Sequence, residues 1–276
     1  MSNLKKICLR HPVIFSIIIY FIFIYLTELR LDKFFTGYMD KQSASYLNGI
    51  VTQGLAALVI LIIVDGLGLF KISRITGPGK WKQVWLAWPI LILSVLNGWS
   101  VFGGAEKVDT SSPGLLILFV LVYISTGLFE EFLGRGLIMT IMLHKWGKTK
   151  KGIYSAVLLS GLLFGLFHLI NLIMGRSTFI FVATQVGYAL FFGVFFAALM
   201  LRCNSIWIPV AAHAVFDICG NFNEVIINGS FGRLQEATPL NAMLVLLLTL
   251  PLLLYGLFIL RKVEPLTENG GAGSAK

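Results

Sequence analysis

Long apolar stretches alternate with short polar connections along almost the whole chain. A helix needs about 20 predominantly apolar residues to cross a bilayer. Eight stretches approach or exceed that length, and they lie near residues 12–29, 48–70, 83–102, 114–143, 152–173, 179–201, 205–222 and 241–260. A lipid-embedded backbone must satisfy its own N–H and C=O groups, and no strand-length alternation accompanies these stretches. We therefore expect each of them to be a helix.

The pattern predicts an all-α protein, a polytopic transmembrane helix bundle with about eight spans. We divide it into three N-terminal spans in residues 1–110, a core of four spans in residues 111–222 and a last span in residues 223–262. Residues 263–276 are rich in Gly near their end, and we expect them to form a disordered tail.

Composition and charge support a membrane protein and indicate its orientation. Hydrophobic residues make up 57% of the chain and charged residues only 13%, which excludes an ordinary soluble domain. With both termini in the cytoplasm, fifteen of the 22 Lys and Arg residues fall in cytoplasmic segments. The positive-inside rule therefore predicts that orientation. The net charge of +9 is then explained by contact with anionic lipid, and no run resembles a nucleic-acid-binding module. The compact plan and many lysines favour a multi-pass protein of a bacterial plasma membrane.

Ionisable residues interrupt the apolar stretches at a few positions. Each costs about 2.5–3.5 kcal/mol at the centre of a span, so such residues usually face a bundle interior or a wet cavity. Three expected spans carry most of them: Glu130, Glu131 and Arg135 on the fourth, His168 on the fifth, and His213 and Asp217 on the seventh. Other polar residues in spans, such as Asn97 and Gln185, are scattered, and we assign them structural roles.

The two adjacent glutamates point about 100° apart on a helix, so they cannot serve one site in the same way. Glu131 precedes Arg135 by four residues, the favourable order for an intrahelical ion pair, and we assign that pair to structure. Glu130 has no such partner, and it shares its face with small residues that include Gly127 and Gly134. The room beside Glu130 fits either a water molecule or metal, or the close approach of a neighbouring helix.

The fifth and seventh expected spans each bring a histidine. Gly161 and Gly165 stand four residues apart and predict a close helix contact beneath His168. A lone histidine of this kind is more often a hydrogen-bonded core residue than a ligand. On the seventh span, His213 and Asp217 share a face one turn apart, an arrangement in which a carboxylate fixes which ring nitrogen is free to act.

In this order, these residues resemble the CPBP family of intramembrane proteases. That family includes the CAAX prenyl endopeptidases and the bacterial Abi proteins linked with bacteriocin processing or self-immunity. Its three motifs E-E-x-x-x-R, F-x-x-x-H and H-x-x-x-[ND] correspond here to Glu130, Glu131 and Arg135, to Phe164 and His168, and to His213 and Asp217. The similarity covers about residues 110–222.

The resemblance implies an intramembrane endopeptidase that hydrolyses a peptide bond in a membrane-associated protein or peptide. In one implied mechanism, Glu130 activates water with help from His168, while His213 and Asp217 stabilise the oxyanion. In the other, Glu130, His168 and His213 bind a divalent metal, namely Zn²⁺, and the protein is a metalloprotease. Both mechanisms need a wet pocket around these side chains. Glu131, Arg135 and Phe164 are then expected to be structural residues that support the catalytic side chains.

Asp217 departs from the asparagine that is frequent at this place in the family. An ionised aspartate cannot donate a hydrogen bond to an oxyanion. Asp217 is therefore held neutral by burial, orients His213, or helps to bind metal. We favour the orienting role, which predicts partial tolerance of asparagine at position 217.

Two other classes of function compete with the protease. A catalytically idle family member could act as a membrane scaffold or regulator, or as a bacteriocin self-immunity protein. The buried acid and histidine positions could instead form an ion path through a transporter. Transporters commonly show repeated halves or paired broken helices, and neither is evident here. For the protease, leader peptides, signalling peptides, bacteriocin precursors and prenylated CAAX proteins are all candidate substrates.

Overall fold

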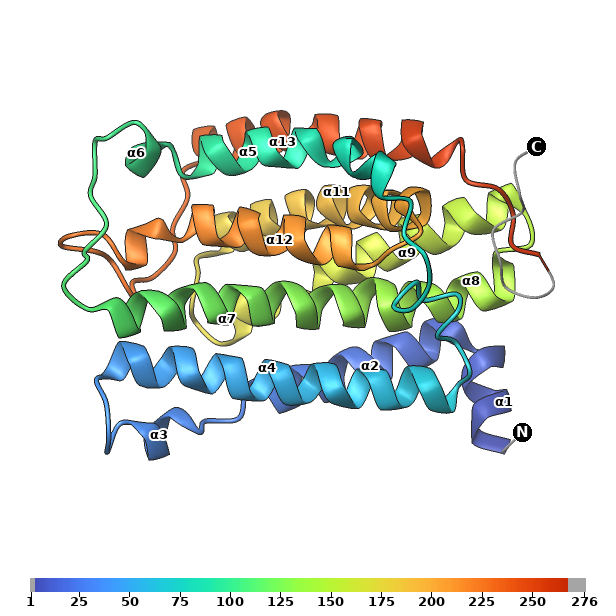
Figure 1. The fold of residues 1–276 in the computed structure, drawn as a ribbon, viewed down its shortest axis with the longest axis horizontal. Helices are drawn as coiled ribbons and strands as arrows, with labels where there is room; N and C mark the ends of the chain where they lie inside the picture. Colours follow the sequence, from blue (N-terminus) through green and yellow to red (C-terminus); the bar gives the residue numbers. More distant parts are fainter. Residues whose placement is uncertain (1–2, 268–276) are drawn as a thin grey trace.

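A computed structural model describes residues 3–267, and over that range the chain forms an elongated bundle of helices without strands (Figure 1). This confirms the expected all-α class. The elements in chain order are α1 (Asn3–Arg10), α2 (Pro12–Thr27), α3 (Asp32–Phe35), α4 (Lys41–Gly66), η1 (Trp81–Ala87), α5 (Trp88–Asn97), α6 (Trp99–Phe102), α7 (Pro113–Glu131), η2 (Phe132–Met139), α8 (Thr140–Trp146), α9 (Lys150–Phe167), α10 (Ile170–Ile173), α11 (Phe179–Cys203), α12 (Trp207–Gly220), η3 (Phe222–Glu224) and α13 (Pro239–Leu260).

Six helical stretches in the described range are long and apolar enough to cross a membrane, so the expected count of eight spans is not confirmed. They are Pro12–Phe35, Lys41–Gly66, Pro113–Trp146, Lys150–Ile173, Phe179–Cys203 and Pro239–Leu260. The third expected span consists of the 3₁₀-helix η1, the 10-residue helix α5 and the short helix α6. Pro89 in the first turn and Gly98 at the C-cap bound α5. The seventh expected span is the 14-residue helix α12.

The helices form two connected rows. α4, α7, α12 and α5 follow one another in contact across the bundle, and α9, α11 and α13 form a second row beside them (Figure 1). Gly161 and Gly165 of α9 allow the close contact with α11 that their spacing predicts. A Cβ atom at Gly165 would lie 2.6 Å from the carbonyl oxygen of Val186, and one at Gly161 would lie 3.2 Å from the nitrogen of Val194.

A stretch of π-helix interrupts the longest span. α7, η2 and α8 run without a break through Pro113–Trp146, and η2 is the π-helical part. All of η2 is buried, and the hydroxyl of Thr140 donates a hydrogen bond to the carbonyl oxygen of Arg135 at 2.9 Å. π-helical turns are rare and occur frequently at functional sites. Here the π-helix directly follows Glu130 and Glu131.

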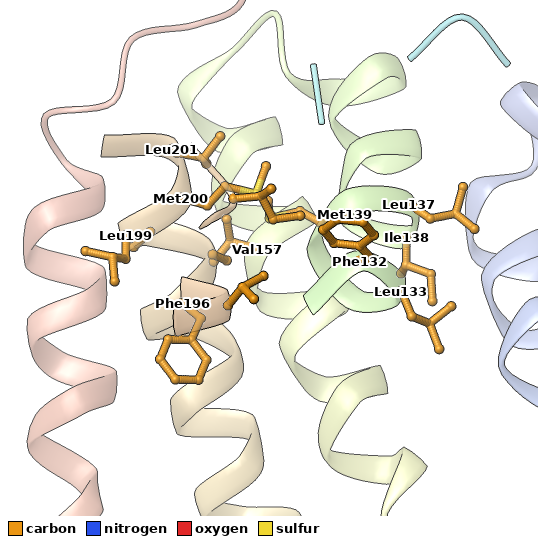
Figure 2. Packing of buried hydrophobic residues seen from close by; sticks show 14 of the residues in the cluster. Phe132, Leu133, Leu137, Ile138, Met139, Val157, Phe196, Leu199, Met200 and Leu201 are labelled. Atoms are coloured by element: carbon orange, nitrogen blue, oxygen red, sulfur yellow. The ribbon is translucent and has the colours of Figure 1, made fainter. Parts of the chain in front are cut away.

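One half of the bundle is filled with apolar side chains. Side chains of η2, α9 and α11 share the buried layer drawn in Figure 2. Every residue from 192 to 201 in α11 is buried, and Phe196 and Met200 lie in this layer together with Phe132 and Val157. Close packing of this kind holds helices together by dispersion, since lipid is as apolar as the side chains.

This packed half lies at the end of the bundle that also holds α1, α8 and the last turn of α13 (Figure 1). Lys145 Nζ donates to the carbonyl oxygen of Arg10 at 2.5 Å, and the Leu266 N–H donates to the carbonyl oxygen of Gly147 at 2.9 Å. The two ends of the described chain therefore lie together, while their cytoplasmic side stays a prediction. Of the tail expected to be disordered, residues 268–276 lie outside the described residues.

The opposite end is covered by residues 221–238, called the cap segment below. It is joined to two other loops by isolated β-bridges, one between Val108 and Ile226 and one between Ser177 and Gln235. The cap segment is also tied to the bundle by Glu224, whose carboxylate accepts hydrogen bonds from Tyr46 of α4 and Tyr123 of α7. It closes over the part of the bundle that contains a cavity.

Candidate active site

A cavity of about 550 Å³ lies inside the bundle beneath the cap segment, and side chains from three helices meet at its inner end. Glu130 comes from the end of α7, His168 from the C-cap of α9, and His213 and Asp217 from α12. Phe164 of α9 also lines it. The expected layer of polar groups on separate helices is therefore present, and it faces one shared space.

The neighbouring Glu131 and Arg135 point away from this cavity into the packed half. Glu131 Oε1 lies 2.9 Å from Arg135 Nη1, and the two side chains are 0% and 2% exposed. The structure thus contains the ion pair that the spacing predicts. The Arg135 guanidinium lies 4.3 Å from the ring centre of Phe164 and 5.6 Å from that of Phe196, so aromatic faces complete its surroundings.

Glu131 also holds His213, which sequence reasoning missed. Glu131 Oε1 lies 2.9 Å from His213 Nδ1. Because the pairing with Arg135 keeps Glu131 an acceptor, His213 Nδ1 is the donor, and Nε2 remains for the cavity. The sequence favours Asp217 for this orienting role, but in the structure the Nδ1–H of His213 donates its hydrogen bond to Glu131. Phe196 stacks on the same imidazole, with ring centres 5.3 Å apart.

The other side of the His213 ring faces two further carboxylates. His213 Nε2 lies 3.5 Å from Asp217 Oδ2 and 3.7 Å from Glu130 Oε2. The side chains of Glu130 and Asp217 are 15% and 19% exposed, in contrast to the fully buried Glu131. His213 therefore stands between a dry carboxylate on its Nδ1 side and two cavity-facing carboxylates on its Nε2 side.

His168 is fixed in a similar way by the backbone. Its Nδ1 lies 3.1 Å from the carbonyl oxygen of Phe164, and since a carbonyl only accepts, Nδ1 carries the hydrogen. In the neutral ring, Nε2 is then the nitrogen with a free lone pair. The Phe164 ring packs edge-on to both histidines, with ring centres 5.3 Å from His168 and 6.1 Å from His213. Phe164 therefore supports both imidazoles and Arg135 at once.

Close packing accounts for the small residues near Glu130. A Cβ atom at Gly127 would lie 3.0 Å from the nitrogen of Ala214 in α12, which brings the backbones of α7 and α12 together. At Gly134 a Cβ atom would contact Phe164 at 3.7 Å. Of the two explanations left open by the sequence, the close approach of a neighbouring helix holds for Gly127, whereas Gly134 makes only ordinary side-chain contacts. The cavity reaches Glu130 from the side of the cap segment.

Side-chain amides line much of the cavity, and sequence reasoning did not bring them together. They belong to Asn97, Asn171, Gln185, Asn221, Asn223, Gln235 and Asn241. Asn171 Nδ2 donates to Gln185 Oε1 at 2.9 Å, which joins α10 to α11 across the wall. Gln185 thus has the structural role assigned to it, as the acceptor of a hydrogen bond between two helices, and both Asn97 and Gln185 also line the cavity. Most of the amide residues lie near helix ends, on the side of the bundle opposite the lysine-rich segments, and this position is the signal that the sequence offers for them.

Among residues 3–267, no group of three or more His, Cys, Asp and Glu side chains is placed so that it could hold a metal ion. The expected donors Glu130, His168 and His213 share the cavity but do not form such a cluster. As they are placed in the described structure, these three side chains therefore do not form a three-ligand zinc site.

One family model matches the part of the chain that forms this site. Residues 112–219 match the model described as type II CAAX prenyl endopeptidase Rce1-like, and this range contains all three motifs. The match is consistent with the CPBP family to which the motifs point. Together with the six apolar helices, it supports an integral multi-pass membrane protein with a segment that is similar to a family of membrane proteases. A comparison with curated proteins found no match.

Proposed function

We propose that this chain, which carries an Rce1-like segment of the CPBP family at residues 112–219, is an intramembrane endopeptidase with Glu130 as its general base. One observation carries the proposal: Glu130, His168, His213 and Asp217 reach the same cavity of about 550 Å³ from three helices. Its substrate is a peptide bond in a membrane-associated protein or peptide that enters this cavity.

Glu130 is the group best placed to activate water. It belongs to the cavity wall and is partly exposed, whereas Glu131 is sealed and shared between Arg135 and His213. In the proposed reaction, a water molecule attacks the carbonyl carbon of the scissile bond while Glu130 takes its proton. Glu130 then returns the proton to the leaving nitrogen as the C–N bond breaks. Water is consumed, and a carboxylic acid and an amine are formed.

The two imidazoles serve the same water and the developing oxyanion. His168 has its Nδ1–H on the Phe164 carbonyl, so Nε2 of the neutral ring can accept a hydrogen bond from the attacking water. His213, held at Nδ1 by Glu131, can donate from Nε2 in its protonated form to the oxyanion. Because both rings are fixed by their other nitrogen, they need little rearrangement during the reaction.

The amide-lined wall suits an extended peptide. Carboxamide groups both donate and accept hydrogen bonds, so they can pair with the N–H and C=O groups of a substrate backbone whatever its side chains. A chain unwound within the bundle needs such partners, because unsatisfied backbone groups are costly away from water. The amides of this wall therefore favour a peptide substrate over an ion path.

The test compares membrane peptides from cells that carry the wild type, Glu130→Gln or His168→Ala. Loss of a general base or of its partner typically lowers a rate by roughly 10²–10⁴-fold, so the product peptides should disappear in both variants. Glu106→Gln, which changes an exposed loop carboxylate outside the site, serves as the matched control and should retain them. Protein levels in the membrane must be equal in all strains.

Two results would count against this proposal. If all strains gave the same peptides at equal protein levels, the scaffold or self-immunity role would be preferred. If the purified wild-type protein contained one zinc ion per molecule and the Glu130→Gln variant contained none, the metal mechanism would replace the one described here.

A further inference from the structure

A second cavity, of about 800 Å³, lies at the opposite end of the bundle, where α8 turns into α9. We call it the lysine groove. It is lined by Lys145, Trp146, Lys148, Thr149, Lys151, Gly152, Ser155, Leu158, Leu159 and Leu162. None of these residues lines the candidate active site, so the groove is separate from that site.

The turn that forms the groove has a fixed backbone. The hydroxyl of Thr149 accepts a hydrogen bond from the Gly152 N–H at 3.0 Å and caps α9. A Cβ atom at Gly152 would lie 1.8 Å from the carbonyl oxygen of Trp146, so glycine is required there. This close approach sets α8 and α9 at a tight angle and places Lys148 and Lys151 around one space.

The charged part of the groove has one sign. Three of its lining residues are lysines, and none of them is an aspartate or glutamate. Lys150 belongs to the same turn but is used elsewhere, because its Nζ donates to the carbonyl oxygens of Arg261 and Val263 and to the carboxylate of Glu264. Lys145 is held at the edge of the groove by its hydrogen bond to the Arg10 carbonyl. The groove is therefore complementary to an anion.

The other part of the groove is apolar and continues along α9. Leu158 and Leu162 are four residues apart on one face of the helix, and they are 43% and 39% exposed. They lie within Lys150–Ile173, one of the candidate membrane spans. A free phosphate or a soluble anion would make no use of this apolar arm. An acyl chain beside the helix would cover it.

We propose that the lysine groove binds an anionic phospholipid, with its phosphate headgroup at Lys145, Lys148 and Lys151 and an acyl chain along Leu158 and Leu162. Basic pockets at the ends of membrane helices bind lipid headgroups by this combination of charges. Trp146 supports the position, since tryptophan is enriched at the level of the headgroups. The groove thus fixes the α8–α9 end of the catalytic core to the surface of the bilayer.

The test uses native mass spectrometry of the purified full-length protein in micelles that contain dioleoyl phosphatidylglycerol or dioleoyl phosphatidylcholine. The wild type should retain the anionic lipid in preference to the zwitterionic one. Lys148→Gln/Lys151→Gln should lower retention of phosphatidylglycerol roughly tenfold or more, since each lysine near the surface contributes to the attraction. Lys80→Gln/Lys82→Gln removes the same charge from exposed lysines outside the groove and should lower retention much less than the groove pair does.

A second variant tests the apolar arm. Leu158→Trp keeps every lysine but fills the groove, and it should lower retention of phosphatidylglycerol as well. Equal midpoints of thermal unfolding would show that the variants fold. The proposal is overturned if the lysine pair and its control lose lipid equally, or if neither groove variant loses any. It is also overturned if soluble glycerophosphoglycerol binds as tightly as the lipid, because the site would then be one for free anions.

Discussion

The packed half and the hollow half of the bundle are built from the same helices and differ in what fills them. In α11, residues 192–201 are all buried, whereas Thr184, Gln185 and Tyr188 of the same helix line the cavity. The first stretch packs mostly against apolar side chains, whereas the second faces a cavity that amides and hydroxyls line together with aromatic rings such as Phe181 and Phe216. The comparison shows that the same helices can pack closely at one end of the bundle and surround a cavity with polar groups at the other end.

The candidate site lies on the boundary between the two halves. Glu131 and Arg135 extend into the packed half, and Glu130 extends into the cavity. One step along the chain changes the exposure of a glutamate side chain from 15% to 0%. Adjacent residues of the same type thus have separate tasks, because a helix turns about 100° per residue.

The largest effect on the fold should come from breaking the ion pair in the packed half. Arg135→Met would leave Glu131 as a buried carboxylate without its cation, and removing one partner of a buried pair costs roughly 3–5 kcal/mol. We expect a large fall in the midpoint of thermal unfolding of the purified protein. The exposed pair of Arg30 and Asp32 offers a matched control, and Arg30→Met should cost less than about 1 kcal/mol.

A double variant separates the charge from the shape. Glu131→Gln/Arg135→Met removes both charges and should regain much of the stability lost in Arg135→Met. It should still lack activity, because His213 loses its carboxylate acceptor. If the single and double variants were equally unstable, packing around Phe164 and Phe196 rather than charge would dominate this half.

A smaller effect is expected in the hollow half, at Asp217. The carboxylate of Asp217 lies 3.5 Å from His213 Nε2, while Glu131 makes the hydrogen bond that orients this ring. Asp217→Asn keeps the shape of the side chain, so we expect an activity within about tenfold of the wild type. Quantification of the product peptides would measure it. Complete loss of product with an unchanged fold would show that the charge of Asp217 is required.

The smallest effect concerns the cap segment over the hollow half. Glu224 Oε2 accepts hydrogen bonds from Tyr46 at 2.8 Å and from Tyr123 at 2.9 Å. Burial raises the pKa of the Glu224 carboxyl above its usual value, and these hydrogen bonds lower it in part. The folded cap therefore holds the Glu224 proton more tightly than the unfolded chain does. Its contribution to stability is greatest at low pH and falls as pH rises through the raised pKa.

Glu224→Gln removes this titration. The difference between the midpoints of thermal unfolding at about pH 5 and about pH 8 should be smaller in this variant than in the wild type. Glu106→Gln, at an exposed position, should keep the difference of the wild type. An unchanged pH dependence in Glu224→Gln would mean that other groups control the cap segment.

Local spacing predicted the contacts that lie within one helix or between regular helix faces. The pair of Glu131 and Arg135 follows from the distance of four residues, and the close contact of α9 with α11 follows from Gly161 and Gly165. Such contacts depend only on the geometry of a helix. The fold class was predicted for the same reason, since apolar length alone decides it.

Contacts between distant segments were beyond local spacing. The hydrogen bond from His213 to Glu131 depends on the rotation of α12 against α7, which Gly127 and Ala214 set by backbone contact. The cavity wall combines amides from segments as far apart as Asn97 and Asn241. The expected count of spans is not confirmed, because Pro89 and Gly98 bound the short helix α5 and the seventh expected span is the 14-residue helix α12.

The π-helix after Glu131 has a consequence for how the longest span behaves under sequence change. A bonding pattern of i to i+5 holds one more residue than the α-helical pattern, so η2 contains slack that an ordinary helix lacks. Removal of a single residue between positions 132 and 139 would let the helix rewind. The helix beyond it, including the turn that carries Lys148 and Lys151, would then keep its rotation relative to Glu130, because the π-helical pattern accommodates one extra residue. The same deletion in an α-helical part of this span would turn everything beyond it by about 100°.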